Sequence, residues 1–291
     1  MNKSEIRILK PGDEAVLEEF LLPRLESSMF LLRNLRKYGL LDRDQPYEGT
    51  YAAAFYGERI IGVVAHYRTN TLICQSPLHL VDLLWPAVIA ATRRPVGGLM
   101  GPIEQVSVMK GLIKLSRLNI KLDESEKLYS LKLADLAIPD ELKSGKVQGR
   151  RIEPRDIELM TRWRVAYAIE ALGDKESPEL WKQCHNSVKR SLKEGHTWVL
   201  EEQGEPVACS LFNSVIKEAV QIGGVWTPPT LRGRGYGRCV VAASLLNTRS
   251  EGMEKAVLFT GENNFAAQKA YTALGFQHIG GYRLVLLQSL L

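Results

Sequence analysis

The most informative part of this sequence is the stretch Arg232-Gly233-Arg234-Gly235-Tyr236-Gly237. It follows an apolar run at residues 219–226 and precedes a second one at residues 239–246. This order predicts a strand, a glycine-rich turn and a helix whose first amides have no partner within the helix. Such amides and the helix dipole attract anions, and glycines let a ligand approach the main chain. The stretch therefore predicts a binding site for a pyrophosphate-bearing cofactor.

Two other phosphate-binding loops fit this stretch less well. A dinucleotide fingerprint has its third glycine three residues after the second, whereas Gly237 follows Gly235 by two. The chain also ends too soon after this helix for a second nucleotide-binding half. A Walker-type loop ends in Lys-Ser or Lys-Thr, and neither follows these glycines. Both alternatives are therefore disfavoured.

A second motif lies downstream of the first. Residues 255–260 are predicted to form a buried strand, and residues 264–276 a short helix that Gly275 ends. The pattern Arg232-x-x-Gly235-x-Gly237 matches Q/R-x-x-G-x-G/A. The residues that match N-x-x-A-x-x-x-Y-x-x-x-G-F are Asn264, Ala267, Tyr271, Gly275 and Phe276. Together the two patterns resemble those of the GNAT superfamily of N-acetyltransferases, over residues 147–291.

This resemblance implies acetyl-CoA as the cosubstrate and assigns roles to individual residues. Strand residues before the loop would pair with the pantetheine arm, and Asn264 would contact the cofactor near a gap between strands. Tyr271 would lie by the thioester sulfur, and its spacing from Asn264 places both on one helix face. The cofactor-binding residues expected from the resemblance are Val225, Trp226, Thr227, Arg232, Gly233, Arg234, Gly235, Tyr236, Gly237, Arg238 and Asn264.

The implied reaction is the transfer of an acetyl group to a primary amine by direct attack. The amine attacks as the free base, and a backbone N–H on the strand before the loop can stabilise the resulting oxyanion. The departing CoA thiolate takes a proton, because a free thiol has a pKa of about 8.5. Tyr271 is the candidate general acid, and packing of its helix against the sheet is its alternative role.

The general base is left open by the sequence. Relatives that acetylate protein N-termini often carry a glutamate on the strand before the asparagine helix, where this chain has Phe259. Glu262 is the candidate base, with Glu218, Glu170 and a water chain as substitutes. Such glutamates are more often solvated surface charges. The missing glutamate supports a second hypothesis, in which the chain binds or senses acyl-CoA and transfers nothing.

Length and composition fit a cytoplasmic enzyme of two domains. The chain has 291 residues, of which 45% are hydrophobic and 24% charged, and its net charge of +5 suits an anionic cofactor. Residues 1–11 are polar and charged, unlike a signal peptide. The apolar stretch 78–92 contains Asp82 and Pro86 and is too short to cross a bilayer. It is expected to be a core helix, kinked or bounded at Pro86, and no membrane association is expected.

The cysteines and basic residues add no second site. The five histidines and four cysteines have no ligand spacing, so no metal is expected, and the cysteines are expected to be buried reduced thiols. The basic cluster at residues 33–38 alternates with leucines at helical spacing, which predicts an amphipathic helix and not a nucleic-acid surface. The resemblance implies an amine as the partner: a small amine, an amino acid, an aminoglycoside-like compound or a peptide terminus. The cysteines are Cys74, Cys184, Cys209 and Cys239.

The first half of the chain resembles the second in outline. Residues 7–13 echo residues 151–156, and residues 55–63 echo residues 202–208, which indicates a duplicated architecture. Where a phosphate loop is expected, the first half has Gln75-Ser76-Pro77-Leu78-His79, with no glycine or arginine. This half is therefore expected to be a degenerate copy. It either forms part of the acceptor site or serves only as a packing partner.

The expected fold class is α/β, with two tandem GNAT-type domains. Each is expected to have a mixed, mostly antiparallel central sheet with helices on both faces. The expected boundaries are a degenerate domain at residues 1–138, a linker at residues 139–149 and an acetyl-CoA-binding catalytic domain at residues 150–291.

Overall fold

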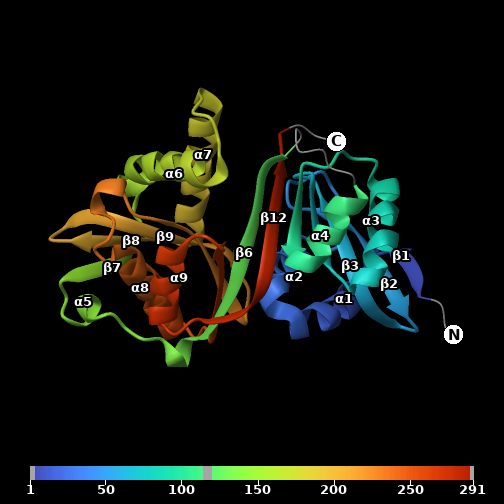
Figure 1. The fold of residues 1–291 in the computed structure, drawn as a ribbon, viewed down its shortest axis with the longest axis horizontal. Helices are drawn as coiled ribbons and strands as arrows, with labels where there is room; N and C mark the ends of the chain where they lie inside the picture. Colours follow the sequence, from blue (N-terminus) through green and yellow to red (C-terminus); the bar gives the residue numbers. More distant parts are fainter. Residues whose placement is uncertain (1–3, 114–119, 289–291) are drawn as a thin grey trace. The chain divides into compact units, whose positions relative to one another are not determined.

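The structure is a computed structural model, and it describes residues 4–113 and 120–288. The chain divides into two compact units, drawn in Figure 1 with colours that follow the sequence. The first unit is Met1–Leu128 with Gly280–Leu291, and the second is Tyr129–Ile279. Most of the last strand among the described residues, from Gly280 on, thus belongs to the first unit, although it follows the second unit in the sequence.

The first unit is a sheet in the order β1-β2-β3-β4-β5-β12. Its neighbouring strands are antiparallel except β4 and β5, which are parallel. The strands are β1 (Glu5–Ile8), β2 (Gly49–Tyr56), β3 (Arg59–Tyr67), β4 (Thr71–Gln75), β5 (Gly98–Pro102), β12 (Gln277–Leu287) from Gly280 on, and residues 120–128 of β6 (Ile120–Lys132). The helices are α1 (Glu14–Leu21), α2 (Leu25–Tyr38), α3 (Leu78–Thr92) and α4 (Ile103–Leu112), and η1 (Leu22–Arg24) is a short 3₁₀ turn.

Helices cover both faces of this first sheet. The core beneath α3 and α4 contains Val64, Leu99 and Val285, each fully buried. The alternate residues Val63 and Ala65 of β3 are also buried, on the face where α1 packs. The apolar stretch 78–92 forms one continuous helix, α3, with Pro86 inside it. The expected core helix is confirmed, and it does not end at the proline.

The second unit is a sheet in the order β11-β10-β9-β8-β7, with β6 as the neighbour of β11. Only β10 and β11 form a parallel pair among the pairings described for this sheet. The strands are β7 (Val147–Arg151), β8 (Thr197–Glu202), β9 (Glu205–Val215), β10 (Ala219–Trp226), β11 (Lys255–Gly261) and residues 129–132 of β6. The helices are α5 (Asp140–Lys143), α6 (Ile157–Leu172), α7 (Pro178–Glu194), α8 (Tyr236–Ser250) and α9 (Phe265–Ala273), and the 3₁₀ turns are η3 (Leu133–Asp135), η4 (Pro154–Asp156) and η5 (Pro229–Leu231).

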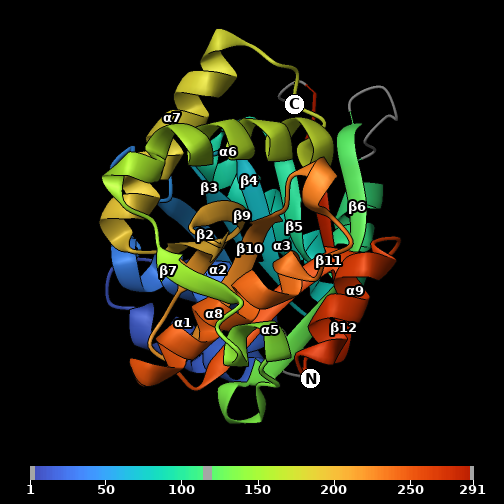
Figure 2. The same cartoon turned by 90° about the vertical axis from the view of Figure 1, so that its left-hand side faces the viewer.

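Alternate residues of the second sheet face two different helical layers. Trp198 of β8 packs with Val240 of α8 in one buried cluster. The next residue, Val199, packs with Met160 of α6 and Val188 of α7 in another. Figure 2 shows α6 and α7 on the opposite side of this sheet from α8. The expected α/β class, with a mixed and mostly antiparallel sheet between helices in each of two units, is confirmed.

The compact units are not divided at the positions expected from the sequence. Residues 139–149, expected to be a linker, include α5 and the start of β7 and lie within the second unit. The first unit in turn needs β12, because Val285 of that strand lies in its core. As a division into functional domains, the boundaries at residues 138 and 149 remain a prediction.

Candidate active site

Strands β10 and β11 pair over only part of their length. Their parallel pairing runs from Ala219 with Lys255 to Ile222 with Leu258. Both strands continue beyond that point, β10 to Trp226 and β11 to Gly261. On the side of β10 that faces away from β9, residues 223–226 therefore form no ladder with the described part of β11. Backbone groups on such an edge can pair with an extended ligand.

Strand β10 also contains a β-bulge at this place. Gly223 pairs with Leu211, and Trp226 pairs with Cys209, so that two residues of β10 oppose one residue of β9. Gly224 in the bulge has φ +55°. A Cβ added there would lie 2.7 Å from Leu211 Cδ2 and 3.2 Å from Arg164 Nη1. Both the backbone angle and the lack of space require glycine at residue 224.

The glycine-rich stretch forms the predicted turn between β10 and α8. Gly233 has φ +79° and Gly235 has φ +81°, in the left-handed region that favours glycine. Gly235 is the N-cap of α8, and no side chain caps that helix end by a hydrogen bond. The first amides of α8 are therefore open to an anion, and the helix dipole adds to the attraction.

Two arginines beside this turn are paired with carboxylates. Arg238 Nη2 lies 3.2 Å from Glu141 Oε1 of α5, and Arg232 Nη2 lies 2.9 Å from Glu170 Oε1 of α6. The Arg232 guanidinium also lies over the Trp226 ring, 4.9 Å from its centroid. These pairs fix both guanidinium groups close to the turn, with a glutamate balancing each charge, and leave both arginine side chains partly exposed to solvent.

Tyr236 does not direct its hydroxyl toward the turn. The residue is buried, and its phenol donates a 2.5 Å hydrogen bond to Glu202 Oε2. This bond to a carboxylate, together with burial, raises the pKa of Tyr236 above its usual value. The side chain thus anchors α8 to β8, and only its backbone amide belongs to the predicted anion site.

The structure gives Asn264 and Tyr271 clear structural contacts. Asn264 is the N-cap of α9, where its Oδ1 accepts a 3.1 Å hydrogen bond from the amide of Ala267. Tyr271 of α9 is buried, and its ring centroid lies 6.0 Å from that of Phe276. Their proposed contacts with a cofactor remain predictions.

The candidate bases are scattered around the second unit. Glu262 is exposed just after β11, and Glu170 is held by Arg232. Glu218 lies in the turn between β9 and β10. Phe259 occupies the strand position at which the resemblance would place a glutamate base, and it is half-buried on β11.

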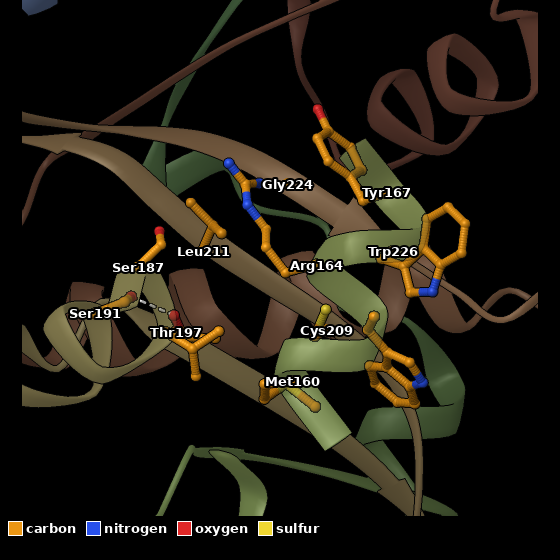
Figure 3. A pocket seen from close by; sticks show the side chains of 12 residues that line it. Met160, Arg164, Tyr167, Ser187, Ser191, Thr197, Cys209, Leu211, Gly224 and Trp226 are labelled. Atoms are coloured by element: carbon orange, nitrogen blue, oxygen red, sulfur yellow. Dashed lines mark hydrogen bonds between the residues drawn. The ribbon is translucent and has the colours of Figure 1, made fainter. Parts of the chain in front are cut away.

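The second unit also has a pocket that the sequence did not reveal (Figure 3). It lies beneath α6 and α7, on the face of the sheet opposite to α8. It holds about 380 Å³ of space, part of it open to solvent, and its lining is mostly apolar and aromatic. Gly224 and Trp226 of β10 form part of its wall, so the pocket reaches the bulge. The lining residues are Met160, Trp163, Arg164, Tyr167, Ser187, Val188, Ser191, Thr197, Cys209, Leu211, Gly224 and Trp226.

The groups in this pocket differ in charge. Arg164 is the one charged residue of the lining. Burial raises the pKa of the Cys209 thiol to about 12, so that this thiol is neutral and a weak nucleophile near pH 7. Ser191 and Thr197 are hydrogen-bonded to each other through their hydroxyls.

The one sequence signal for the bulge beside this pocket was the doubled glycine at residues 223–224, since glycine within a strand often marks a bulge or a close approach.

Three further observations concern the cysteines, possible metal ligands and apolar helices of the described residues. The four cysteines are free and buried. Across residues 4–113 and 120–288, no group of three or more His, Cys, Asp or Glu side chains is placed to hold a metal ion. None of the helices in this described part combines the length and apolar character needed to span a membrane.

Comparison with known proteins identifies the family of the second unit. Residues 158–276 match the family model described as the acetyltransferase (GNAT) family. This part of the chain is therefore a GNAT acetyltransferase domain, as the two sequence motifs indicated. No curated protein matched the chain in a sequence comparison.

Solved structures resemble the whole chain and not only this domain. A Drosophila protein aligns with a TM-score of 0.65 at 15% identity, over 98% of this chain and 99% of its own. A GCN5-related N-acetyltransferase from Sphaerobacter thermophilus gives a TM-score of 0.58 at 14% identity, over 97% and 94%. A tandem GNAT protein from the clavulanic acid biosynthesis pathway gives 0.53 at 11% identity, over 99% and 98%. At these identities the likeness concerns the fold, and it confirms the tandem GNAT architecture.

Proposed function

We propose that the second unit transfers an acetyl group from acetyl-CoA to a primary amine. Membership of an acyltransferase family supports acyl transfer in general. The observation that carries the finer proposal is the N-terminus of α8, which has no side-chain cap and follows the part of β10 that lies beyond its pairing with β11. An anion site followed by an open strand edge suits a cosubstrate with a pyrophosphate and an extended amide arm.

The proposed binding mode uses the expected residues in order. The backbone of Val225, Trp226 and Thr227 pairs with the pantetheine arm. Residues 233–238 hold the pyrophosphate through their amides, with Arg232, Arg234 and Arg238 supplying positive charge. Asn264, at the start of α9, contacts the cosubstrate near the gap between β10 and β11.

The proposed chemistry is direct attack of the amine on the thioester carbonyl carbon. The new C–N bond produces an oxyanion, which a backbone N–H of the bulge at Gly224 stabilises. The C–S bond then breaks, and Tyr271 donates a proton to the CoA thiolate. The amine nitrogen loses its proton to a base. Glu262 is exposed, so a proton would reach it through water.

A second candidate function is the binding of acyl-CoA without transfer. Phe259 in place of a glutamate favours it, and so do the structural contacts of Asn264 and Tyr271. In this alternative, Asn264 caps α9 and Tyr271 packs against Phe276, and neither residue takes part in chemistry. The anion site at α8 would serve both functions equally.

The acceptor is proposed to be a small molecule or a peptide amine. A cytoplasmic location is also proposed, because four free, buried cysteines fit a compartment in which thiols remain reduced.

The test of the proposed function has two stages. Thermal shifts are compared for CoA, acetyl-CoA, longer acyl-CoAs and NAD, because a ligand that binds only the native state raises the Tm. Acetyl-CoA is expected to raise the Tm and NAD to leave it unchanged. Release of CoA thiol is then measured with a library of amines. Binding of acetyl-CoA without amine-dependent thiol release would replace transfer by the sensing function.

A further inference from the structure

We propose that Arg164 selects an acceptor that carries a carboxylate beside an apolar body, as an apolar amino acid does. This inference rests on the proposed acyl transfer and specifies the substrate class of that site. The amine would lie toward the bulge of β10, the carboxylate on the Arg164 guanidinium and the apolar body among the aromatic side chains of the pocket.

The position of Arg164 supports this assignment. Its Nη1 atom lies 3.2 Å from the point that a Cβ of residue 224 would occupy, so the guanidinium lies against the bulge. Figure 3 shows its side chain extending toward Gly224 between Leu211 and Tyr167. A group held by Arg164 is thus adjacent to the strand that, in the proposed binding mode, carries the thioester end of the cosubstrate.

The bonding of Arg164 leaves its guanidinium able to hold an anion. Its guanidinium lies 5.1 Å from the centroid of the Tyr167 ring, a cation–π contact. Within residues 4–113 and 120–288, no carboxylate, carbonyl or hydroxyl forms a hydrogen bond or ion pair with it. By contrast, Arg232 and Arg238 of the same unit each have a glutamate partner. A planar guanidinium in a partly apolar setting matches a carboxylate through two parallel hydrogen bonds.

The lining of the pocket excludes other acceptor classes on charge. No aspartate or glutamate lies among its lining residues, and Arg164 makes the pocket positive. A polyamine or an aminoglycoside would bring several ammonium groups to a place with no carboxylate to receive them. Trp163, Tyr167 and Trp226 instead offer apolar and aromatic surface, which suits a side chain such as that of leucine or phenylalanine.

The test uses the full chain, acetyl-CoA and pairs of acceptors that differ by one carboxylate. The pairs are L-leucine with 3-methylbutylamine, L-methionine with 3-(methylthio)propylamine, L-phenylalanine with phenethylamine and L-tryptophan with tryptamine, and spermidine represents the polycations. For each pair, the ratio of kcat/KM values is compared between the wild type and Arg164→Met. Because the ratio of ratios is used, differences in amine pKa between pair members cancel.

We expect Arg164→Met to lower the preference for the carboxylate by about 10- to 100-fold, the range for a hydrogen bond to a charged group. The decarboxylated amines should be little affected. Arg164→Lys should retain part of the preference, because lysine supplies charge without the planar fork. Arg162→Met, at an exposed position of the same helix, should leave the ratio unchanged.

Each other outcome has a distinct meaning. Equal loss with both members of every pair would assign Arg164 a structural role and overturn the inference, while the proposed function would stand. Faster turnover of spermidine than of any amino acid would overturn it as well. If acetyl-CoA binds but no amine releases thiol, acyl transfer fails, and calorimetry of the amino acids against the CoA-bound protein decides. Binding that Arg164→Met abolishes supports the inference, and no binding overturns it.

Discussion

The two units share one supersecondary motif, a parallel strand pair joined by a helix, but the turn before that helix differs between them. In the first unit, β4, α3 and β5 form a parallel pair joined by a helix, and β10, α8 and β11 do so in the second. The helix α3 begins after Pro77, whereas α8 begins after the left-handed Gly235. The same fold therefore presents two different helix N-termini.

The polar groups at the end of β4 are satisfied within the first unit. The amide of Ser76 donates a 2.9 Å hydrogen bond to Gln105 Oε1. Gln75 Oε1 accepts hydrogen bonds from the hydroxyls of Ser27 and Ser28. Neither α3 nor α8 has a side-chain hydrogen bond at its N-cap. The helices differ in the turn before them, which contains the left-handed Gly233 and Gly235 at α8 and Pro77 at α3. Under the proposed function, the capacity for an anion therefore lies in the turn and not in the fold.

The largest expected effect comes from the turn itself. Gly235→Glu should weaken acetyl-CoA binding by more than about 100-fold, because it strains a left-handed position and adds a charge that repels phosphate. Calorimetric titration measures the Kd. Gly57→Glu is the matched control: Gly57 is also left-handed, with φ +62°, but lies in the first unit. Equal affinities for acetyl-CoA in the two variants would break the distinction between the units.

The second prediction concerns the proposed general acid. Tyr271→Phe should lower turnover by about 100-fold, a typical contribution of general acid catalysis, with little change in affinity for acetyl-CoA. Steady-state kinetics and calorimetry provide the two values. Tyr67→Phe serves as control, because Tyr67 is a fully buried tyrosine of the first unit. Unchanged turnover in Tyr271→Phe would remove this residue from the mechanism.

A third prediction separates the stability of the units. Val285→Ala in β12 should cost about 2 kcal/mol of stability, because it removes two buried methyl groups and leaves a cavity. Affinity for acetyl-CoA should not change, because this side chain lies in the core of the first unit. Val220→Ala, at an equally buried position of β10, is the matched variant in the second unit. Chemical denaturation and calorimetry give both quantities. Loss of acetyl-CoA binding in a folded Val285→Ala variant would contradict the prediction that the core of the first unit does not affect this binding.

The smallest expected effect is a pH dependence in the first unit. Burial, with a contribution from Glu124, raises the pKa of Glu126 to about 7, and its Oε2 has no hydrogen-bond partner among the described residues. The native state then binds more protons than the unfolded state between the unfolded pKa and about pH 7, so stability falls as pH rises through this range. Glu126→Gln should remove that slope.

Thermal unfolding between pH 5 and pH 8 measures this difference. The exposed Glu58, in the turn between β2 and β3, provides a Glu58→Gln control that should keep the wild-type slope. Parallel curves for the wild type and Glu126→Gln would show that Glu126 is not the titrating group.

The sequence predicted the features that depend on local order. The glycines at residues 233 and 235, the helix after them and the short helix that ends before Gly275 follow from short-range rules of turn and helix formation. The family followed from two motifs in the same region. The lack of a phosphate loop near Gln75 also predicted the contrast between the units.

The missed features depend on residues that are distant in the sequence. The pairing of β12 with β5 places the end of the chain in the first unit, and no local pattern specifies such a partner. Glu141 and Glu170 are brought to the arginines of the turn only by folding. The pocket at Arg164 is assembled from two helices and three strands, so periodicity along any one segment does not reveal it.

Amide hydrogen exchange with and without acetyl-CoA tests the central claim most directly. Acetyl-CoA is expected to slow exchange at residues 233–238 and in the first turn of α8, and to leave residues 76–80 at the start of α3 unchanged. Protection at the start of α3, or binding of acetyl-CoA with no protection at residues 233–238, would contradict the account.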